Sequence, residues 1–569
     1  MIFDDIKTER DVERLKKRIV KDDALFARIE NIRKKMRKAG NNTEGSGNPI
    51  FAEKSDAHKM PTNAETMLLY QEMLESGQQG ENTQTENMLR KIKTRSNSGV
   101  AVVSLLTKPY PCPGRCTYCP DAKNMPKSYL EKEPAAARAL AHNFDPYEQV
   151  QGRLRALTAN GHPIDKIEMI IIGGTWSFYH PVYQKEFIKE CFRACNNFTA
   201  NTPETRTNSE AGNIKKGEMS LEELHEINET ALCRIIGLSI ETRPDYITSH
   251  ELERLRMLGV TKVEIGVQHL DNDVLRLVKR DMTRESIAKS TEKLRNAGFK
   301  VVYHMMPNLP GSDIKKDIEM FKELFNGKQF QPDMLKIYPC MVLDNTELYK
   351  TWKEGLHRVY TNEELMRVLA SVKKDIPPYV RLIRVIRDLP AEYIKAGSIV
   401  SNMRQWLKDD MKKNGWQCKC VRCREIRNEA VYMKDFNLTK IEYETETGKE
   451  IFLSYEHKDT QKLAAFLRLR LPVQGNEKVE KVQSGNLSVL RGAALVRELH
   501  TYGQLIPVSE EGTQTQHVGL GKRLMQEAEL IAREAGYEKV AVISGVGVRD
   551  YYRKKLGYEL EDTYMVKYL

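Results

Sequence analysis

Three cysteines lie close together in the first half of the chain, in the segment Cys112-Pro-Gly-Arg-Cys116-Thr-Tyr-Cys119. In a reducing compartment, clustered thiols are read as metal ligands rather than as disulfides. Most iron–sulfur clusters have four thiolate ligands, so three thiolates would leave one iron open to another ligand. A zinc ion completed by a distant residue is the alternative. The spacing alone does not separate these two sites.

A second group, Cys418-x-Cys420-x2-Cys423, is as dense in thiolates as known zinc sites. A fourth ligand is not evident in the sequence. We therefore expect a structural zinc ion here, with three free thiols as the alternative.

A glycine-containing segment precedes a predicted helix near the C-terminus. Glycines let the backbone approach a phosphate, and a helix N-terminus offers free N–H groups and a favourable dipole. Such a loop alone is weak evidence for a nucleotide ligand. Its residues are Gln516, Gly519, Leu520, Gly521 and Lys522.

These residues must be positioned by two sets of strands and helices. From Gly99 onward, short apolar runs alternate with helical segments: GVAVVSLLT, EMIIIGG, RIIGLSIET, KVEIGVQ, KVVYHMMP and MLKIYP. Such runs are typical of parallel strands covered on both faces, in right-handed βαβ units. Six units predict an α/β fold with a partial (β/α) barrel, whose active site would lie at the carboxyl ends of the strands. Residues 196–217 interrupt the pattern and are predicted to be an exposed insertion.

The C-terminal part has a different pattern. LTKIEYETE and KEIFLSYEH alternate polar and apolar residues, and a long helix and a final βαβ-like stretch follow. The sequence thus predicts four parts: a helical basic N-terminal region at 1–90, a barrel at 91–408, a cysteine-rich bridge at 409–433 and a second α/β domain at 434–569.

Length and charge limit the function classes. A chain of 569 residues is too long for a single core. A net charge of +11 favours a polyanionic partner. The sequence has no apolar stretch long enough for a bilayer, and its charged N-terminus does not resemble a signal peptide. We expect a cytoplasmic protein with no membrane partner.

Two motifs carry a family resemblance. C-x3-C-x2-C with an aromatic residue before the last cysteine resembles the radical S-adenosylmethionine (SAM) signature, and Q-x-x-G-x-G resembles the coenzyme A loop of GNAT acetyltransferases. Together they resemble the catalytic subunit of Elongator in its single-chain archaeal or bacterial form. The resemblance runs from about residue 91 to 569 and includes GLSIETRPD, YHMMPNLPGS, RVIRDLP, LVRELHTYG, QHVGLG and VISGVGVRDYY.

The resemblance implies cofactors and site residues. A 4Fe–4S cluster would be held by Cys112, Cys116 and Cys119, and SAM would bind its open iron. Gly173 and Gly174 resemble the glycine motif that meets the methionine amino group. Four residues at later strand ends are further candidates for SAM, although each would equally suit an ion pair at the barrel rim: Glu241, Arg243, Glu264 and Gln268.

The family's acetyl-CoA contacts carry over to a second set: Lys166, Glu498, Leu499, His500, Thr501, Leu520, Gly521, Lys522 and Tyr552. Lys166 would contact coenzyme A phosphates, with an exposed salt bridge as its alternative. Tyr551 and Tyr552 would lie near the thioester, and core packing is the alternative for one of them. Lys336 is predicted to face the substrate, because an unpaired ammonium inside a strand would be costly.

The implied reaction modifies the wobble uridine of tRNA. A 5′-deoxyadenosyl radical would take a hydrogen atom from the acetyl methyl group of acetyl-CoA. The carbon radical would add to C5 of the uracil, and thioester hydrolysis would leave a 5-carboxymethyl group. The partners would be the tRNA anticodon stem-loop, bound partly by the basic N-terminus, and an electron donor for the cluster. Protein lysine acetylation is the alternative activity, and a tRNA-binding scaffold is a third. The sequence leaves homodimer formation open.

Overall fold

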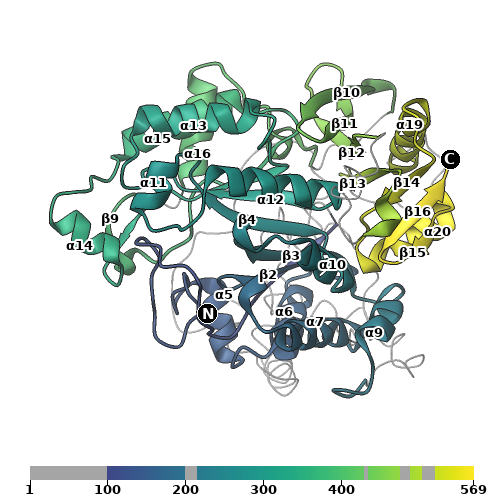
Figure 1. The fold of residues 1–569 in the computed structure, drawn as a ribbon, viewed down its shortest axis with the longest axis horizontal. Helices are drawn as coiled ribbons and strands as arrows, with labels where there is room; N and C mark the ends of the chain where they lie inside the picture. Colours follow the sequence, from purple (N-terminus) through teal and green to yellow (C-terminus); the bar gives the residue numbers. More distant parts are fainter. Residues whose placement is uncertain (1–98, 199–213, 401, 428–432, 475–486, 503–518) are drawn as a thin grey trace, which may run out of the picture.

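The computed structural model describes residues 99–198, 214–400, 402–427, 433–474, 487–502 and 519–569 (Figure 1). The predicted basic region 1–90 and most of the predicted insertion lie outside the described residues. Among the described residues, no helix combines the length and the apolar character needed to cross a membrane.

The first sheet is an open, fully parallel half-barrel, as the sequence predicts. Its order is β1-β2-β3-β4-β5-β6-β8. The strands therefore lie side by side in the order in which they occur in the chain, and every neighbouring pair is parallel. The strands are β1 (Ala101–Leu106), β2 (Lys166–Ile172), β3 (Arg234–Thr242), β4 (Lys262–Gln268), β5 (Lys300–Met305), β6 (Met334–Ile337) and β8 (Arg381–Arg384). The first six correspond to the predicted apolar runs. The seventh, β8, was not predicted, because it has only four residues and two of them are arginines.

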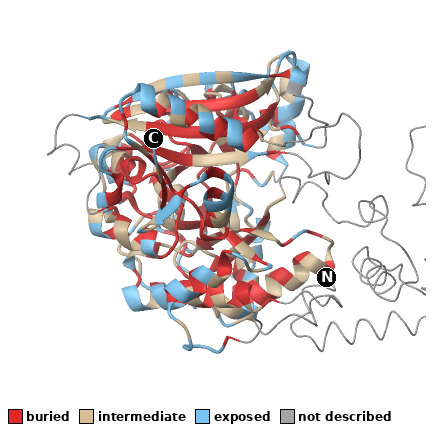
Figure 2. Ribbon diagram, turned by 90° about the vertical axis from the view of Figure 1, so that its right-hand side faces the viewer, coloured by how far each residue is buried: buried red, intermediate tan, exposed pale blue. Residues whose placement is uncertain are grey.

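Helices cover the outer face of this sheet (Figures 1 and 2). Most begin at a side chain that accepts a backbone N–H, as Ser220, Thr283 and Thr361 do in full capping boxes. The helices are α5 (Pro134–Ala141), α6 (Pro146–Ala159), α7 (Pro181–Asn196), α9 (Leu221–Asn228), α10 (Ser249–Met257), α11 (Asn272–Leu277), α12 (Arg284–Asn296), α13 (Ile314–Asn326), α14 (Glu347–Lys353), α15 (Asn362–Asp375) and α16 (Met403–Lys413). Helix α16 runs across residue 409, where the sequence predicts the cysteine-rich bridge to begin.

The two faces of the half-barrel differ in polarity. In β2, Ile167, Met169 and Ile171 are at most 1% exposed and pack into the core. The alternate residues Glu168 and Ile170 line a cavity on the concave face. The strand alternation therefore places apolar side chains under the helices and several charged ones inside the half-barrel.

The second sheet has the order β10-β11-β12-β13-β14-β16-β15. Its strands are β10 (Phe436–Thr445), β11 (Gly448–His457), β12 (Leu463–Pro472), β13 (Ala493–Thr501), β14 (Lys539–Val542), β15 (Glu559–Glu561) and β16 (Tyr564–Tyr568), and its helices are α19 (Leu520–Glu534) and α20 (Arg549–Leu556). The two predicted strands are present as β10 and β11, which pair antiparallel. The predicted final strand–helix–strand order is also present, as β14, α20 and β15. Its strands are not parallel, because β15 turns directly into β16, which pairs antiparallel with β14. Three small elements complete the fold: the β7 (Val342–Leu343) and β9 (Ile394–Ala396) pair and α17 (Val421–Arg424).

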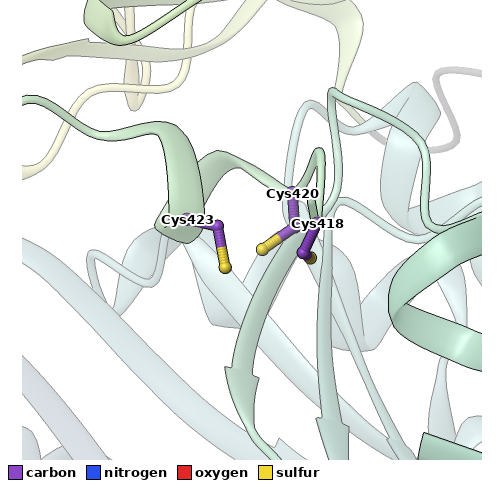
Figure 3. Close-up of side chains that lie close together, drawn as sticks. All are labelled: Cys418, Cys420 and Cys423. Atoms are coloured by element: carbon purple, nitrogen blue, oxygen red, sulfur yellow. The ribbon is translucent and has the colours of Figure 1, made fainter. Parts of the chain in front are cut away.

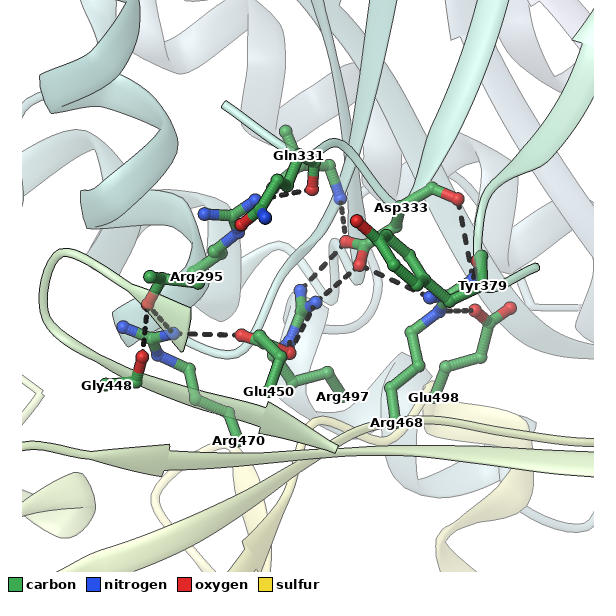
Figure 4. A network of polar contacts seen from close by, with 12 residues as sticks. Arg295, Gln331, Asp333, Tyr379, Gly448, Glu450, Arg468, Arg470, Arg497 and Glu498 are labelled. Atoms are coloured by element: carbon green, nitrogen blue, oxygen red, sulfur yellow. Dashed lines mark hydrogen bonds and ion pairs between the residues drawn. The ribbon is translucent and has the colours of Figure 1, made fainter. Parts of the chain in front are cut away.

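A buried ionic network joins the two sheets (Figure 4). Asp333, just before β6, is fully buried and receives both guanidinium nitrogens of Arg497 from β13, at 2.9 and 2.5 Å. Arg497 also contacts Glu450 of β11, and Glu450 contacts Arg470 of β12 at 2.9 Å. Burying charge is costly unless it is paired in this way. The network therefore fixes the position of the second sheet relative to the half-barrel.

Candidate active site

One cavity of about 1110 Å³ is lined by residues of both sheets. All three cysteines of the first group lie in its wall at the carboxyl ends of the barrel strands. Glu498, Leu499 and His500 of β13 line the same cavity. The concave face of the half-barrel therefore connects the cysteine loop with the second sheet.

The cysteine loop follows β1 directly. Cys119 N donates to Cys116 O at 3.1 Å, and Cys112 Sγ lies 3.7 Å from Thr175 Oγ1. Burial alone would raise the pKa of Cys116, but the guanidinium of Arg280, which donates to its sulfur at 3.4 Å, brings the pKa below the usual thiol value. Burial raises the pKa of Cys119 to about 12. Soft thiolates beside cationic donors are a donor set that suits an iron–sulfur cluster.

Gly173 and Gly174 form a turn at the carboxyl end of β2. Their φ values are 132° and 78°, which side chains rarely adopt. A Cβ on Gly173 would lie 2.0 Å from Thr107 Oγ1. Glycine is thus required at this turn, and Gly174 lines the cavity.

Arg243 and Gln268 also line the cavity, and each has a buried polar atom without a partner among the described residues: Arg243 Nη1 and Gln268 Oε1. Arg243 is otherwise held by Asp245 at 2.9 Å and by the carbonyl oxygen of Arg280 at 3.1 Å. Buried polar atoms are rarely left unpaired. These two atoms fit a polar ligand such as SAM, whose amino and carboxylate groups could pair with them.

Polar side chains from four strands meet deeper in the cavity. The buried Glu264 contacts the ammonium of Lys336 and accepts from Ser239 Oγ at 3.1 Å, and His304 Nε2 lies 2.8 Å from it. Tyr129 donates to Glu241 at 2.6 Å, and Glu241 lies 3.8 Å from Lys336. Burial would lower the pKa of Lys336, but the Glu264 carboxylate outweighs it and keeps the lysine charged. Glu241, Glu264 and His304 lie close enough to hold a metal ion. The ammonium of Lys336 already supplies the positive charge there, so we assign no metal.

The second sheet contributes the opposite end of the cavity. Glu498 accepts from Arg468 Nε at 2.8 Å. His500 stacks on Phe466 with ring centroids 5.7 Å apart, and its ring lies tilted against Tyr502 with centroids 4.4 Å apart. Burial lowers the pKa of His500 to about 4, so the ring is neutral near pH 7. Thr501 is exposed at the end of β13.

The predicted phosphate loop meets β13 at the start of α19. Gly519 has a φ of 95° and caps the helix. A Cβ on Gly521 would lie 3.1 Å from the hydroxyl of Tyr551 and 3.7 Å from Leu499. Leu520 is buried and Lys522 is exposed, while Gln516 lies outside the described residues. Tyr551 is 39% exposed, whereas Tyr552 is 6% exposed and packs against Tyr558. Of the two tyrosines, Tyr551 is thus the one at the helix start.

Lys166 lies apart from these groups. It begins β2 at the amino end of the strand, and its ammonium pairs with Asp165 at 3.3 Å. It is not among the residues that line the cavity. This position matches the exposed salt bridge that the sequence offers as the alternative.

The cysteines of the second group lie close together (Figure 3), and none of them lines the cavity. The sulfur atoms of Cys418, Cys420 and Cys423 all lie within 4.8 Å of one another. Sulfurs around a tetrahedral zinc ion are separated by about 3.8 Å, as Zn–S bonds of about 2.3 Å require. Cys418 and Cys420 are buried and Cys423 is exposed. Within the described residues this grouping contains no fourth His, Cys, Asp or Glu ligand.

Sequence reasoning missed several charged residues of the cavity. Arg280 contacts Cys116 but follows a short helix rather than a strand. The others interrupt apolar strands at alternate positions and therefore share the concave face: Glu168, Lys262, Lys300 and His304. That alternation was a usable signal, because a charged residue inside an apolar strand must face either a partner or a cavity.

Comparisons with known proteins agree with this geometry. Residues 110–324 match the Radical SAM superfamily model, and residues 332–413 match the Radical_SAM C-terminal domain model. The tRNA uridine(34) acetyltransferase of Methanocaldococcus jannaschii is 43% identical over 85% of this chain and 87% of its own length. Elongator complex protein 3 of Homo sapiens is 38% identical over 84% of this chain and 85% of its own length.

A solved structure also matches. The archaeal Methanocaldococcus infernus Elp3 with an N-terminal deletion superposes with a TM-score of 0.68 at 39% identity, over 83% of this chain and all of that chain. The radical SAM family implies a 4Fe–4S cluster and SAM, and the cysteine loop, the glycine turn and the unpaired atoms of Arg243 and Gln268 fit them. The chain belongs to the Elongator complex protein 3 (Elp3) family of radical SAM acyltransferases.

Proposed function

We propose that this enzyme uses SAM and acetyl-CoA to form 5-carboxymethyluridine at the wobble position of tRNA. The observation that carries the proposal is the single cavity lined by Cys112, Cys116 and Cys119 at one end and by Glu498, Leu499 and His500 at the other. An acyl group bound at the second sheet would thus face the same cavity as the radical source. The names of the relatives, tRNA uridine(34) acetyltransferases, support the choice of substrate.

The first end of the cavity would hold the radical source. When bound, the cluster and SAM supply a 5′-deoxyadenosyl radical. The chain's own residues would bind and orient SAM. The Gly173–Gly174 turn would let the backbone approach the methionine group, Arg243 Nη1 would donate a hydrogen bond to SAM, and Gln268 Oε1 would accept one from it. In our proposal, Lys336 stays an ammonium paired with Glu264 and orients the uracil or the acyl oxygen.

The second end would hold acetyl-CoA. The N-terminus of α19 offers N–H groups to the pyrophosphate, with Gly521 allowing a close approach beside Tyr551. Leu499 and Thr501 flank the same point. Lys166 contributes only if the Asp165 salt bridge opens, and the buried Tyr552 would support Tyr551 rather than touch the thioester.

The remaining partners follow from the reaction. The tRNA anticodon stem-loop would bring the wobble uridine to the cavity, a cytoplasmic electron donor would reduce the cluster, and zinc at Cys418, Cys420 and Cys423 would have a structural role. The sulfurs are close enough for zinc, but the exposed Cys423 also contacts the Lys373 ammonium at 3.5 Å, which suits a thiolate with or without an ion.

The proposal is tested with anaerobically reconstituted protein, tRNA, a reductant, SAM and acetyl-CoA, followed by nucleoside mass spectrometry. We expect 5-carboxymethyluridine from the wild type. The variant Cys116→Ala should form neither this nucleoside nor 5′-deoxyadenosine, while Cys233→Ala, at a buried cysteine that does not line the cavity, serves as the control. Acetylated lysine peptides without any modified uridine would support the protein acetyltransferase alternative and overturn the proposal.

A further inference from the structure

Three aromatic side chains, Tyr110, Phe178 and Tyr246, form a group at the carboxyl edge of the half-barrel, which we call the aromatic platform; Tyr110 and Phe178 are exposed and Tyr246 is half-buried. Tyr110 follows β1, Phe178 lies in the short helix after β2 and Tyr246 in the short helix after β3. Tyr110 is 37% exposed and Phe178 is 36% exposed. Three consecutive strand ends therefore place an aromatic ring at the edge that also carries the cysteine loop.

The rings contact one another edge to face. The centroids of Tyr110 and Phe178 are 5.9 Å apart at an interplanar angle of 61°, and those of Phe178 and Tyr246 are 6.0 Å apart at 87°. Edge-to-face packing uses only part of each π surface. The platform thus offers aromatic faces to solvent, whereas exposed apolar residues such as Leu232 and Leu356 offer aliphatic ones.

Hydrogen bonds hold the platform rigid. Tyr110 stacks on the buried Tyr179 with centroids 4.7 Å apart, and the Tyr179 hydroxyl donates to the carbonyl oxygen of Lys108 at 2.8 Å. Thr242 Oγ1 donates to Ser177 Oγ at 2.8 Å, which ties the end of β3 to the helix that carries Phe178. A preformed surface binds a ligand at a lower entropic cost than a mobile one.

The surroundings are basic. Lys108 is exposed beside the platform, with its ammonium 4.7 Å from the ring of Tyr183, and Arg115 is exposed in the cysteine loop. Of the acidic residues close to the platform, Asp245 is paired with Arg243 at 2.9 Å, and the buried Glu251 lies against Ser177 and pairs with Arg254. Aromatic faces next to cationic side chains are the combination that binds unpaired nucleotides, because the bases stack on the rings and the phosphates meet the cations.

We propose that the aromatic platform stacks unpaired nucleobases that flank the target base in an RNA loop, while the target itself enters the cavity. Thr175 and Thr242, three and four residues before Phe178 and Tyr246 in the chain, line the cavity, so a base on the platform would be close to one inside. This proposal rests on the proposed function, which identifies the bound RNA as tRNA.

The test measures the affinity of the full-length protein for an RNA hairpin carrying the anticodon loop and for a blunt RNA duplex with the same number of phosphates, at several salt concentrations. Phe178→Leu and Tyr110→Leu keep apolar volume but remove the π face. Stacking is worth about 1–3 kcal/mol per base, so each variant should bind the hairpin about 5- to 150-fold more weakly with an unchanged salt slope. Lys108→Ala should instead reduce the slope of log affinity against log salt concentration by about 1, because one phosphate contact is lost.

Two controls keep the outcome interpretable. Leu232→Ala removes an exposed apolar residue at the amino end of β3 and should bind both RNAs like the wild type. Replacing one flanking base by an abasic site should weaken wild-type binding but not further weaken that of Phe178→Leu, provided that the base stacks there. Leucine variants that bind the hairpin like the wild type, or lose duplex and hairpin equally, overturn the platform even where 5-carboxymethyluridine forms. Absence of that nucleoside with loop-specific binding intact would count against the proposed function alone.

Discussion

At the scale of single residues, the charges around the cysteine loop are the most informative feature. Arg280 donates to Cys116, and Arg243 packs so closely over Gly114 that a Cβ there would lie 2.4 Å from Arg243 Nη1. The cysteine spacing predicts ligands, but neither arginine could be predicted as a neighbour of the cysteines, because Arg243 follows β3 and Arg280 follows helix α11, both far from the cysteine loop in the chain. Sequence reasoning therefore identifies the residues that bind the cluster better than the neighbouring charges that change its reduction potential.

Changing Arg280 to Met should lower the reduction potential of the reconstituted cluster. A positive charge beside a thiolate stabilises the reduced, more negative cluster. A loss on the order of 1.4 kcal/mol corresponds to roughly 60 mV for a one-electron couple. A redox titration followed by electron paramagnetic resonance measures the shift. Arg276→Met, at an exposed arginine paired with Asp273, is the matched control. An unchanged potential in Arg280→Met would show that the arginine has only a packing role.

At the scale of elements, the strands and their order could largely be predicted, because apolar runs separated by helical segments indicate parallel βαβ units. The short strand β8 could not, since RLIR carries no apolar run. The turn from β15 into β16 was missed for a related reason: the final segment is too short for periodicity to distinguish a hairpin from a crossover. The helix predicted after Lys522 is present, but α19 begins earlier, at Leu520, and the sequence pattern did not indicate its proximity to β13 and Tyr551.

Gly521→Val should weaken acetyl-CoA binding by about tenfold, which is about 1.4 kcal/mol. The added side chain would begin 3.1 Å from the hydroxyl of Tyr551 and occupy the approach to the helix N-terminus. Isothermal titration with acetyl-CoA measures the effect. Leu530→Ala, at an exposed position of the same helix, should bind like the wild type. Equal affinity in Gly521→Val would place the coenzyme elsewhere.

His225 in helix α9 should make the free energy of unfolding depend on pH. Burial lowers the pKa of His225 to about 3, with Arg549 and Arg256 acting in the same direction. Between pH 6.5 and about 3 the unfolded chain binds a proton at His225 that the folded protein does not. The contribution of this ring to the free energy of unfolding is therefore fully present above pH 6.5 and is lost as the pH decreases. The loss should reach about 2 kcal/mol by pH 5. In thermal unfolding, His225→Gln should show a smaller decrease than the wild type. Parallel curves for the two proteins would mean that the ring is protonated in the fold.

At the scale of the whole molecule, the two sheets act as one unit. Gly545 and Gly547 pack directly on β3, where a Cβ on Gly545 would lie 2.1 Å from the carbonyl oxygen of Ile236. Asp333 lies in the buried network between the sheets. The sequence predicts two domains, but not this interface, because buried arginines resemble surface arginines in sequence. The shared cavity depends on it.

Asp333→Asn should destabilise the protein by about 3–5 kcal/mol, because it keeps the shape but removes the buried carboxylate that Arg497 and Arg468 share, and leaves them only Glu450 and Glu498. Thermal unfolding measures the loss. Asp344→Asn, at a half-exposed residue paired with the exposed Lys395, should change stability by less than about 0.5 kcal/mol. Similar midpoints for the two variants would show that the network contributes little to the interface.

The central claim is that one cavity delivers an acetyl methyl group to the radical and then to uridine. The most direct measurement uses acetyl-CoA with a fully deuterated methyl group in the anaerobic reaction with tRNA and SAM. One deuterium should appear in 5′-deoxyadenosine, and the other two should remain in the methylene of 5-carboxymethyluridine, provided that they do not exchange with water. Modified uridine formed together with unlabelled 5′-deoxyadenosine would contradict the account.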